Sequence, residues 1–449
     1  MASRPGAGAG ERPGLAARKT AARLLAAIVD RRTPADGLTD DHHGHPQYLA
    51  LEPRDRALVR AILATTLRYR MTISAMLAER LDRPLPANAA TLGHILHVAL
   101  AQMLFLDVPD RAAVDLAVAH AGDDPRTRRF AGLVNAVLRA IGRRKTARLP
   151  TVLEKTVDAP DWFAARLAGV YGDEKATAIL EAHRRPAPVD LTVRDQPQAW
   201  AERLGGIVTP TGSVRLAKLD GPVGALPGYE EGAWWVQDAA AALPSRLLGD
   251  VAGRDVADLC AAPGGKTAQI ASAGARVTAV DISKNRLSRL AENLRRLRLE
   301  ATVIAADLTT FEPEMPFDAV LLDAPCSSTG TVRRHPDVPW TKTPDDIAKL
   351  ADLQSRLLAE TVRLTKPGGV IVFANCSLDP TEGEAVAEQF VGETPEVEAL
   401  PVAPGEIAGI DGWITERGWL RTTPADMDLG RPEISGMDGF FAARFRRRG

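Results

Sequence analysis

The run VADLCAAPGGKT at residues 256–267 opens the stretch around which the chain is organised, residues 255–377. An apolar segment leads directly into a turn rich in glycine and proline, and a helical pattern follows. Glycine lets the backbone approach a ligand closely, and the free N–H groups at the start of a helix favour electron-rich partners. The run therefore predicts a strand–turn–helix unit that faces a bound ligand.

Four further apolar segments follow, and each ends in an acid or is followed by a cysteine. They are residues 277–281, 302–307, 317–323 and 370–374. In a doubly wound α/β fold the carboxyl ends of parallel strands lie along one edge of the sheet, where ligands bind. The sequence therefore predicts a Rossmann-like α/β domain with one ligand crevice. Asp281, at the end of the strand next to the glycine turn, is placed to accept the two hydroxyls of a ribose.

The glycine turn restricts the choice of cofactor. It lacks the Gly-x-Gly-x-x-Gly pattern of dinucleotide sites and the spacing of a phosphate-binding P-loop. S-adenosylmethionine fits better, with its ribose at Asp281, its adenine at the Asp307 loop, and its sulfonium and amino end at the first turn with Asp323. Asp281 and Asp307 could instead cap helices, since Asp often occupies such positions.

Composition limits the class of protein. The chain has 449 residues, 45% of them hydrophobic and 25% charged, which is ordinary for soluble globular proteins. The net charge of −1 means that nucleic-acid binding must use a local patch. No apolar run approaches the roughly 18 to 20 residues of a membrane span. With only three cysteines a disulfide framework is not expected, so we expect a reducing, cytoplasmic location.

Metal-ligand spacing is absent from the sequence. No Cys-x-x-Cys pair and no Cys/His pattern typical of zinc occurs. The cluster of His42, His43 and His45 lies in a segment rich in Gly and Asp with no matching acid or cysteine, so we interpret it as a solvated loop and expect no metal.

The amino-terminal third has a helical pattern. After a tail of 14 residues that we expect to be disordered, apolar residues recur at helical spacing in several segments, with a loop at 34–47. The predicted helices cover residues 15–29, 55–70, 89–106, 111–121 and 130–141. Residues 126–148 carry eight cations and no acid. Such a run is often a solvated face, but in a chain of near-zero net charge it favours contact with nucleic-acid phosphates.

Residues 150–235 predict a smaller α+β domain. Two helices are expected at 162–170 and 174–183, a short one at 199–204, and strands at 189–193 and 213–216. The adjacent Trp234 and Trp235 could stack on bases, although a core position is the better default. A helix over 239–248 and a final antiparallel pair of strands at 419–422 and 439–445 complete the expected elements.

Two cysteines stand just past the ends of predicted strands, in Asp-Ala-Pro-Cys326-Ser and Asn-Cys376-Ser. If those strands are neighbours, both thiols face one crevice, which indicates nucleophilic chemistry. A thiolate can add to the electrophilic C6 of cytosine, after which C5 can accept a methyl group. The site must favour the thiolate, Asp323 could assist at N3 or the amino group, and the base must be unstacked. Cys260, by contrast, completes an apolar strand.

These motifs resemble a known family. Residues 258–267, 323–330, 333–337, 375–378 and 436–441 closely resemble RNA cytosine-5 methyltransferases of the Sun/Fmu and NOL1/NOP2/Sun type, and residues 55–69 and 129–139 resemble the all-helical, RNA-binding NusB family. The combination is similar to bacterial enzymes that methylate 16S ribosomal RNA. The resemblance implies that the cofactor is bound by Cys260, Ala261, Ala262, Pro263, Gly264, Gly265, Lys266, Asp281, Asp307 and Asp323.

The resemblance also implies roles for the two thiols. Cys376 would be the nucleophile and Cys326 would assist breakdown of the adduct. Asp323, from the chemistry considered above, is the third expected catalytic residue. The family usually has Thr where this chain has Asn375, which bears on how the thiol is positioned. Enzymes that methylate cytosine in DNA attack with the Pro-Cys thiol, so Cys326 is the alternative nucleophile.

Together these inferences predict a tail at 1–14, a NusB-like RNA-binding domain at 15–148, a small α+β domain at 149–235 and a methyltransferase domain at 236–449. We expect a monomer that acts on 16S ribosomal RNA and binds neither DNA nor a membrane. Three alternatives stay open: a cytosine-5 methyltransferase for another RNA, a non-enzymatic RNA-binding factor, and a methyltransferase for DNA or a small molecule.

Overall fold

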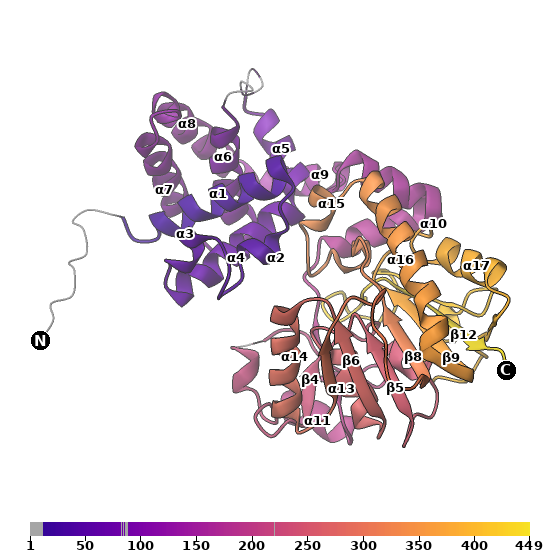
Figure 1. The fold of residues 1–449 in the computed structure, drawn as a ribbon. Helices are drawn as coiled ribbons and strands as arrows, with labels where there is room; N and C mark the ends of the chain where they lie inside the picture. Colours follow the sequence, from indigo (N-terminus) through magenta and orange to yellow (C-terminus); the bar gives the residue numbers. More distant parts are fainter. Residues whose placement is uncertain (1–11, 82, 84, 86–88, 220) are drawn as a thin grey trace, which may run out of the picture. The chain divides into compact units, whose positions relative to one another are not determined.

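The computed structural model describes residues 12–449 apart from 82, 84, 86–88 and 220, and the predicted tail lies almost wholly outside this part. The chain divides into two compact units, coloured along the sequence in Figure 1. One unit consists of the chain up to Arg166 together with His335–Lys342, and the other of Leu167–Arg334 and Thr343–Gly449. We call them the helical unit and the sheet unit. The four-part division of the chain into domains stays a prediction.

The helical unit confirms the predicted all-α fold. Its helices are α1 (Leu15–Arg31), α2 (Ala35–Leu38), α3 (Pro46–Leu49), α4 (Pro53–Arg68), α5 (Arg70–Ala78), α6 (Ala90–Phe105), α7 (Asp110–Asp123), α8 (Ala131–Gly142), α9 (Lys145–Lys155) and α15 (Val338–Thr341). Helix α6 is apolar on nearly every face, as expected of a helix surrounded by others, and most of its residues are buried.

The predicted loop over residues 34–47 is wrong in part. It contains α2 and the start of α3, both of one turn. Pro46 stands at the first position of α3, where its missing N–H would have no partner in any case. His45 Nδ1 accepts a hydrogen bond from Gln47 N at 3.2 Å, so this histidine acts as a helix cap.

The segment His335–Lys342 is folded into the helical unit although it follows the Cys326 loop in sequence. Asp337 Oδ2 accepts a hydrogen bond from Ala35 N at 2.9 Å. The indole N–H of Trp340 donates to Leu67 O at 3.2 Å, and the Arg70 guanidinium lies 5.5 Å from the centre of its ring. The helical unit is therefore completed by residues from the second half of the chain.

The sheet unit begins within α10 (Asp161–His183), which bends at Gly172 between the two predicted helices. A four-stranded antiparallel sheet follows, in the order β2-β3-β1-β4. Its elements are β1 (Val189–Val193), α11 (Pro197–Leu204), β2 (Ile207–Val208), β3 (Val214–Leu216) and β4 (Trp234–Val236). Trp234 and Trp235 are buried, at 0% and 5% exposure, so stacking of these rings on bases is ruled out. The predicted helix over 239–248 is reduced to α12 (Leu243–Arg246).

The larger sheet has the order β10-β12-β9-β8-β5-β6-β7, with β11 paired to β12. Its strands are β5 (Asp255–Leu259), β6 (Arg276–Asp281), β7 (Thr302–Ala305), β8 (Phe317–Asp323), β9 (Thr365–Asn375), β10 (Val397–Ala399), β11 (Leu420–Thr422) and β12 (Phe440–Arg447). The pairs from β9 through β8, β5 and β6 to β7 are parallel, and β12 joins β9 antiparallel. The predicted α/β class and the final antiparallel pair are both confirmed.

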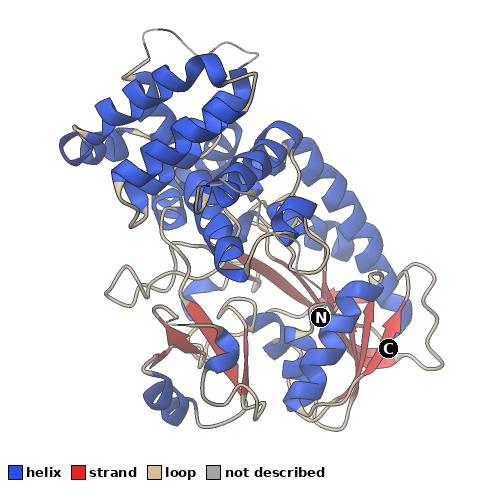
Figure 2. Ribbon diagram, turned by 90° about the vertical axis from the view of Figure 1, so that its left-hand side faces the viewer, coloured by secondary structure: helices blue, strands red, loops and turns tan. Residues whose placement is uncertain are grey.

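Helices cover both faces of this sheet, seen with strands in red and helices in blue in Figure 2. On one face the apolar residues of α16 (Pro344–Leu364) and α17 (Glu384–Glu393) pack with side chains such as Val320, Leu322 and Phe373. The other face carries α12, α13 (Gly265–Ser272) and α14 (Lys284–Leu297). Side chains that alternate along each strand are therefore buried under helices on both faces, as is usual for parallel sheets.

The described part of the chain also contains the short 3-10 turns η2 (Arg128–Phe130), η3 (Val223–Ala225), η4 (Thr329–Thr331) and η5 (Asp411–Trp413). No helix in the described part of the chain is long and apolar enough to cross a membrane.

Candidate functional site

The candidate site lies at the carboxyl ends of the central parallel strands β5, β6, β8 and β9. The sheet order places β8 between β5 and β9, so the glycine turn after β5 and the two cysteine loops are neighbours. Lys266, from the glycine turn, donates to Asp323 Oδ2 at the end of β8 at 2.6 Å. The Lys266 ammonium also lies 4.9 Å from the ring centre of Phe440 on β12. These contacts join three predicted motifs into one site.

The glycine turn packs closely against α14, because Gly264 has no side chain. Gly264 has φ +100, a conformation that favours glycine, and a Cβ there would lie 2.7 Å from Leu290 Cγ. Ala261 N donates to Val280 O at 3.1 Å, which continues the β5–β6 pairing into the turn. The turn residues from Ala261 to Lys266 therefore lie at the carboxyl end of β5, and their role in binding the cofactor stays a prediction.

Cys260 stands apart in character from the other two cysteines. It has φ +58 and packs against the apolar cluster on the α16 face. Burial raises the pKa of its thiol to about 12, with the charges of Asp281 and Asp323 adding to the effect. This thiol stays protonated at neutral pH, so the side chain is a small apolar filler.

Asp281 is buried and strongly hydrogen-bonded by the protein. Its Oδ2 accepts from Ala262 N at 3.2 Å and its Oδ1 from Ser283 N at 2.9 Å, while Arg286 Nη1 lies 3.3 Å from Oδ2. It therefore ties the glycine turn to the start of α14. Ile282 beside it is 72% exposed, an apolar side chain at the edge of the site.

Asp307 is exposed in the loop after β7. Its Oδ1 accepts from Thr309 N at 2.9 Å and from Thr309 Oγ1 at 2.8 Å, so it caps a turn and not a helix, and its contact with the cofactor stays a prediction. These bonds hold the pKa of the carboxyl below its usual range. The loop starts next to Asp281, because Ala306 N donates to Asp281 O at 3.3 Å.

The two remaining thiols meet. Cys326 Sγ and Cys376 Sγ lie 3.4 Å apart, within hydrogen-bonding distance for sulfur. The hydrogen bond from Cys326 lowers the pKa of Cys376, and Ser328 and Lys266 act in the same direction against burial and the charge of Asp323. The same contact raises the pKa of Cys326 well above its usual value, with burial adding to it. The contact therefore favours the thiolate form of Cys376 over that of Cys326.

A buried carboxylate that the sequence reasoning missed lies behind the cysteines. Glu382 is fully buried, and its Oε2 accepts from Ser327 Oγ at 2.5 Å and from Ser377 Oγ at 2.6 Å. Asn375 Nδ2 donates to the backbone oxygen of Glu382 at 2.7 Å. The available signal was an acid shortly after a cysteine loop, which by itself does not specify a contact.

Asp258 is the second residue that the sequence reasoning left without a role. It is fully buried on β5, and its Oδ2 accepts from Thr267 Oγ1 at 2.6 Å. Its Oδ1 is buried without a hydrogen-bond partner among the described residues. Burial raises the pKa of this carboxyl to about 7. An acid inside an apolar strand was its only signal.

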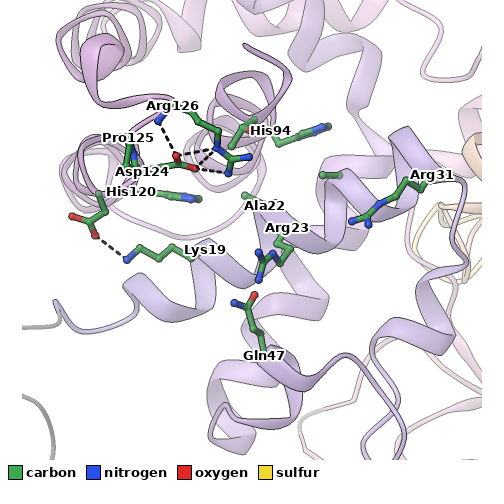
Figure 3. Close-up of a pocket in the computed structure, with 13 residues that line it drawn as sticks. Lys19, Ala22, Arg23, Arg31, Gln47, His94, His120, Asp124, Pro125 and Arg126 are labelled. Atoms are coloured by element: carbon green, nitrogen blue, oxygen red, sulfur yellow. Dashed lines mark hydrogen bonds and ion pairs between the residues drawn. The ribbon is translucent and has the colours of Figure 1, made fainter. Parts of the chain in front are cut away.

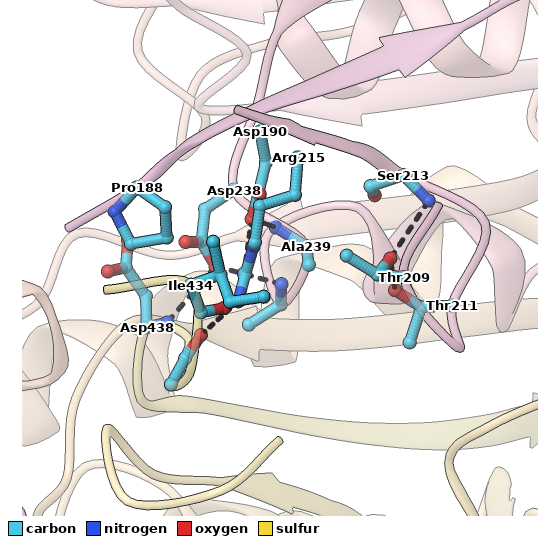
Figure 4. Close-up of polar contacts among 12 residues, drawn as sticks. Pro188, Asp190, Thr209, Thr211, Ser213, Arg215, Asp238, Ala239, Ile434 and Asp438 are labelled. Carbon is cyan, nitrogen blue, oxygen red and sulfur yellow. Dashed lines mark hydrogen bonds and ion pairs between the residues drawn. The ribbon is translucent and has the colours of Figure 1, made fainter. Parts of the chain in front are cut away.

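A buried ionic network supports the site from the side of the four-stranded sheet (Figure 4). Arg215 Nε and Nη2 donate to the two oxygens of Asp190, each at 2.7 Å. Arg334, from the loop after Cys326, donates to Asp238 Oδ2 at 2.5 Å and to Asp438 Oδ2 at 3.1 Å. Asp238 Oδ1 in turn accepts from Asp438 N at 3.1 Å. The motif residues 333–337 are thus divided, with Arg334 in this network and Asp337 in the helical unit.

The helical unit carries exposed cations from the basic segment at residues 126–148. Those that are exposed and form no ion pair within the described residues are Arg128, Arg129, Arg139, Arg143 and Arg144. A separate cavity of about 600 Å³ in this unit, shown in Figure 3, is lined by cationic side chains including Lys19, Arg23 and Arg31. Arg126 lines the same cavity and pairs with Asp124 at 2.7 Å.

The residues described here contain no group of three or more His, Cys, Asp or Glu side chains that could hold a metal ion.

Two segments of the chain are similar in sequence to known protein families. Residues 15–143 match the NusB family, and residues 246–446 match the family described as 16S rRNA methyltransferase RsmB/F. The ribosomal RNA small subunit methyltransferase B of Xanthomonas campestris is 38% identical over 88% of this chain and 92% of its own length. The protein of the same name from Xylella fastidiosa is 37% identical over 96% and 98%.

The fold is also shared with solved structures. The crystal structure of PH0851 aligns with a TM-score of 0.69 at 22% identity and covers 98% of this chain and 100% of its own. From the extent and level of these matches, the chain belongs to the 16S rRNA methyltransferase RsmB/F family and carries a NusB-family segment at its amino-terminal end.

Proposed function

We propose that this protein transfers a methyl group from S-adenosylmethionine to C5 of a cytosine in 16S ribosomal RNA, through a covalent adduct of Cys376. The observation that carries this proposal is the 3.4 Å approach of the two sulfurs at the carboxyl edge of the sheet. A thiol pair in which one member keeps the shared proton supplies a nucleophile and a proton-handling group side by side.

In the proposed reaction the Cys376 thiolate forms a bond to C6 of the target cytosine, and the electron pair of the C5–C6 bond moves toward C5. We assign Asp323, which accepts a hydrogen bond from Lys266 at 2.6 Å, to the N3 and amino edge of the base, where its carboxylate can accept from the amino group. After methylation of C5, the proton on C5 passes to a solvent water, its electron pair re-forms the C5–C6 double bond, and the C6–S bond breaks, which returns the electron pair to Cys376. We assign Cys326 to this release step, in which its S–H donates a hydrogen bond to the departing sulfur of Cys376.

The residues present fit S-adenosylmethionine. Asp258 Oδ1 has no partner among the described residues and is an acceptor for an ammonium group, which would also stabilise the ionised carboxylate. We assign Asp281 at the end of β6 to the ribose, and the apolar surface of the exposed Ile282 beside it supports contact with the adenine. Gly264 lets the turn approach the cofactor, and Asp307 lies in the adjoining loop. When bound, the cofactor supplies an electrophilic methyl group.

We further propose that the helical unit contacts the RNA through the exposed arginines of residues 126–148. Five of these arginines form no ion pair within the described residues, so they are available to phosphates without first breaking one. This part of the proposal favours RNA over a small-molecule substrate, since a small acceptor would have no use for an extended cationic surface.

The test is bisulfite sequencing of 16S ribosomal RNA from cells that lack this protein and from the same cells supplied with the parent chain or with Cys376→Ser. We expect one protected cytosine that disappears in the deletion and returns only with the parent chain. In vitro, labelled S-adenosylmethionine should mark 16S RNA in preference to transfer RNA and duplex DNA. Loss of a mark only in another RNA, or a mark at an atom other than C5, would contradict the proposal.

A further inference from the structure

Glu382 joins the two cysteine loops at matching positions. Ser327 directly follows Cys326, and Ser377 directly follows Cys376. Both serine hydroxyls donate to the same oxygen of Glu382, at 2.5 and 2.6 Å. The other oxygen, Oε1, accepts from Ser327 N at 2.8 Å and from Gln354 Nε2 at 3.2 Å. One carboxylate therefore receives four hydrogen bonds from both cysteine loops and from α16.

The sheet alone does not fix this spacing. The β8–β9 pairing ends where Ala324 N donates to Ala374 O at 2.8 Å, two residues before each cysteine. Beyond that point the backbones need another connection to stay together. Gly330 N donates to Cys376 O at 2.9 Å, which attaches the far end of one loop, and Glu382 attaches the residues next to the sulfurs.

A fully buried carboxylate requires a reason, because removing a charge from water is costly unless the group is well hydrogen-bonded. Burial raises the pKa of Glu382, while the bonds from Ser327 and Ser377 oppose that shift. Among the described residues no cation donates a hydrogen bond to it, and the donors that it does have come from the cysteine loops and from Gln354, whose Nε2 also donates to Pro325 O at 2.8 Å beside Cys326. This is the arrangement of a rigid acceptor rather than of an ion pair.

We propose that Glu382 is a positioning residue, which through Ser327 and Ser377 holds Cys326 Sγ at the distance from which its S–H can donate a hydrogen bond to Cys376 Sγ. We call Glu382, Ser327, Ser377 and Gln354 the carboxylate clamp. The value of this arrangement for methyl transfer rests on the proposed function, but the clamp itself acts on the thiols of the free protein. It is thus testable without RNA or cofactor.

The titratable groups around the pair are few. Cys376 faces Cys326, Asp323 and Lys266, while Cys326 also faces Glu382, and Glu382 faces Asp379. Replacing Glu382 with Gln removes one titratable group and keeps Cys326, Cys376, Asp323, Lys266 and Asp379 in the chain. A Gln amide can accept at only one of its two ends, so at least one donor of the clamp loses its partner and the loops separate. Cys376 then loses the bond that favours its thiolate.

The experiment measures the rate of alkylation of Cys376 by iodoacetamide against pH in the full-length protein, with the modified residue identified by mass spectrometry. The variants are Glu382→Gln, Ser327→Ala and Ser377→Ala. The matched control is Glu388→Gln, since Glu388 is exposed and its oxygen lies 3.6 Å from Arg417. We expect Glu382→Gln to move the midpoint of the profile upward by about one pH unit, which lowers the rate at pH 7 about tenfold. Glu388→Gln should keep the parent profile.

A folded Glu382→Gln protein with the parent profile would overturn the proposal. If Glu382→Gln does not fold, the serine variants decide, because each removes one arm of the clamp and should raise the midpoint by a smaller amount. Unchanged profiles in both serine variants would equally overturn it.

Methyl transfer is then measured in the same variants. A pure positioning role predicts a lower kcat with unchanged KM for the cofactor and for RNA. A shifted thiol profile in a protein that never methylates RNA would leave the clamp standing and remove the proposed function. If the parent protein methylates RNA but the pH profile of Glu382→Gln is unshifted, the proposed function stands and the clamp is wrong.

Discussion

Cys326 and Cys376, fifty residues apart in the sequence, place their sulfurs 3.4 Å from each other at the ends of adjacent parallel strands. The contact is asymmetric, because it raises the pKa of Cys326 and lowers that of Cys376. The assignment of Cys376 as the nucleophile, with Cys326 as the alternative, stays a proposal that the following experiment decides.

The first prediction concerns these two thiols. Cys376→Ser should abolish methyl transfer, because an alcohol is not ionised at neutral pH. Cys326→Ser should instead let a protein–RNA adduct accumulate, seen as a band of reduced mobility on a denaturing gel. If the adduct forms with Cys376→Ser and not with Cys326→Ser, the two roles are exchanged.

Asp258 provides a prediction about pH. Its folded pKa of about 7 lies above the roughly 4 of an unfolded Asp, so the stability from this group is complete below pH 4 and is lost as pH rises to 7. The loss is up to roughly 4 kcal/mol. The side chain introduced by Asp258→Asn does not titrate. In urea denaturation, the free energy of unfolding of the variant relative to that of the parent should therefore increase between pH 5 and pH 8. Equal differences at both pH values would contradict this account.

The same variant should bind S-adenosylmethionine more weakly at pH 8, because the neutral amide cannot pair with the ammonium group. Isothermal titration calorimetry measures the loss. We expect it to be smaller at pH 5, where the parent carboxyl is protonated.

Gly264→Ala tests the glycine turn. The residue has φ +100 and a new Cβ would lie 2.7 Å from Leu290 Cγ, so strain and overpacking should cost about 1 to 3 kcal/mol and weaken cofactor binding. Gly392→Ala is the control, since Gly392 lies in α17 with no atom within 4 Å of a new Cβ. The control should be neutral or more stable by up to about 1 kcal/mol. Equal melting temperatures for the two variants would show that the turn tolerates a side chain.

The exposed arginines of the helical unit predict a salt effect. Arg139→Glu with Arg143→Glu should weaken binding of 16S RNA and reduce the slope of log affinity against log salt by about 0.7 to 0.9 for each phosphate that the variant no longer neutralises. Filter binding across a salt series measures both quantities, and cofactor binding should not change. Arg54→Glu, an exposed cation in α4, is the matched control. An equally large effect in the control would show that the RNA-binding surface is not located in residues 126–148.

The buried pair of Arg215 and Asp190 yields the last prediction. Both side chains are inaccessible to solvent, so Arg215→Met leaves an uncompensated carboxylate and should lower the free energy of unfolding by about 3 to 5 kcal/mol. Removing both charges, with Arg215→Met and Asp190→Leu together, should restore part of that loss. A double variant less stable than Arg215→Met would mean that the remaining bonds of Asp190, such as that to Ala239 N at 2.9 Å, dominate.

The sequence by itself determined the local elements and the chemical types at their ends. Apolar runs such as residues 317–323 and the turn at Gly264 specify strand and turn through neighbours only a few residues away, which is why they could be predicted. The prediction of secondary structure was wrong where local preference is weak. It missed the one-turn helices α2 and α3, and it made the helix at α12 too long. It also left Asp281 and Asp307 open between capping and ligand contact, since both uses need the same residue in the same place.

Only the tertiary structure decided which residues meet. The distance between the two sulfurs depends on β8 lying beside β9, and strand order is set by packing across the whole sheet rather than by any one strand. The same holds for Glu382, whose partners Ser327 and Ser377 come from different loops, and for His335–Lys342, which folds into the helical unit. The pKa values of Cys326 and Cys376 depend on burial and on hydrogen bonds between segments that are distant in the sequence. The sequence alone does not give the distances between those segments.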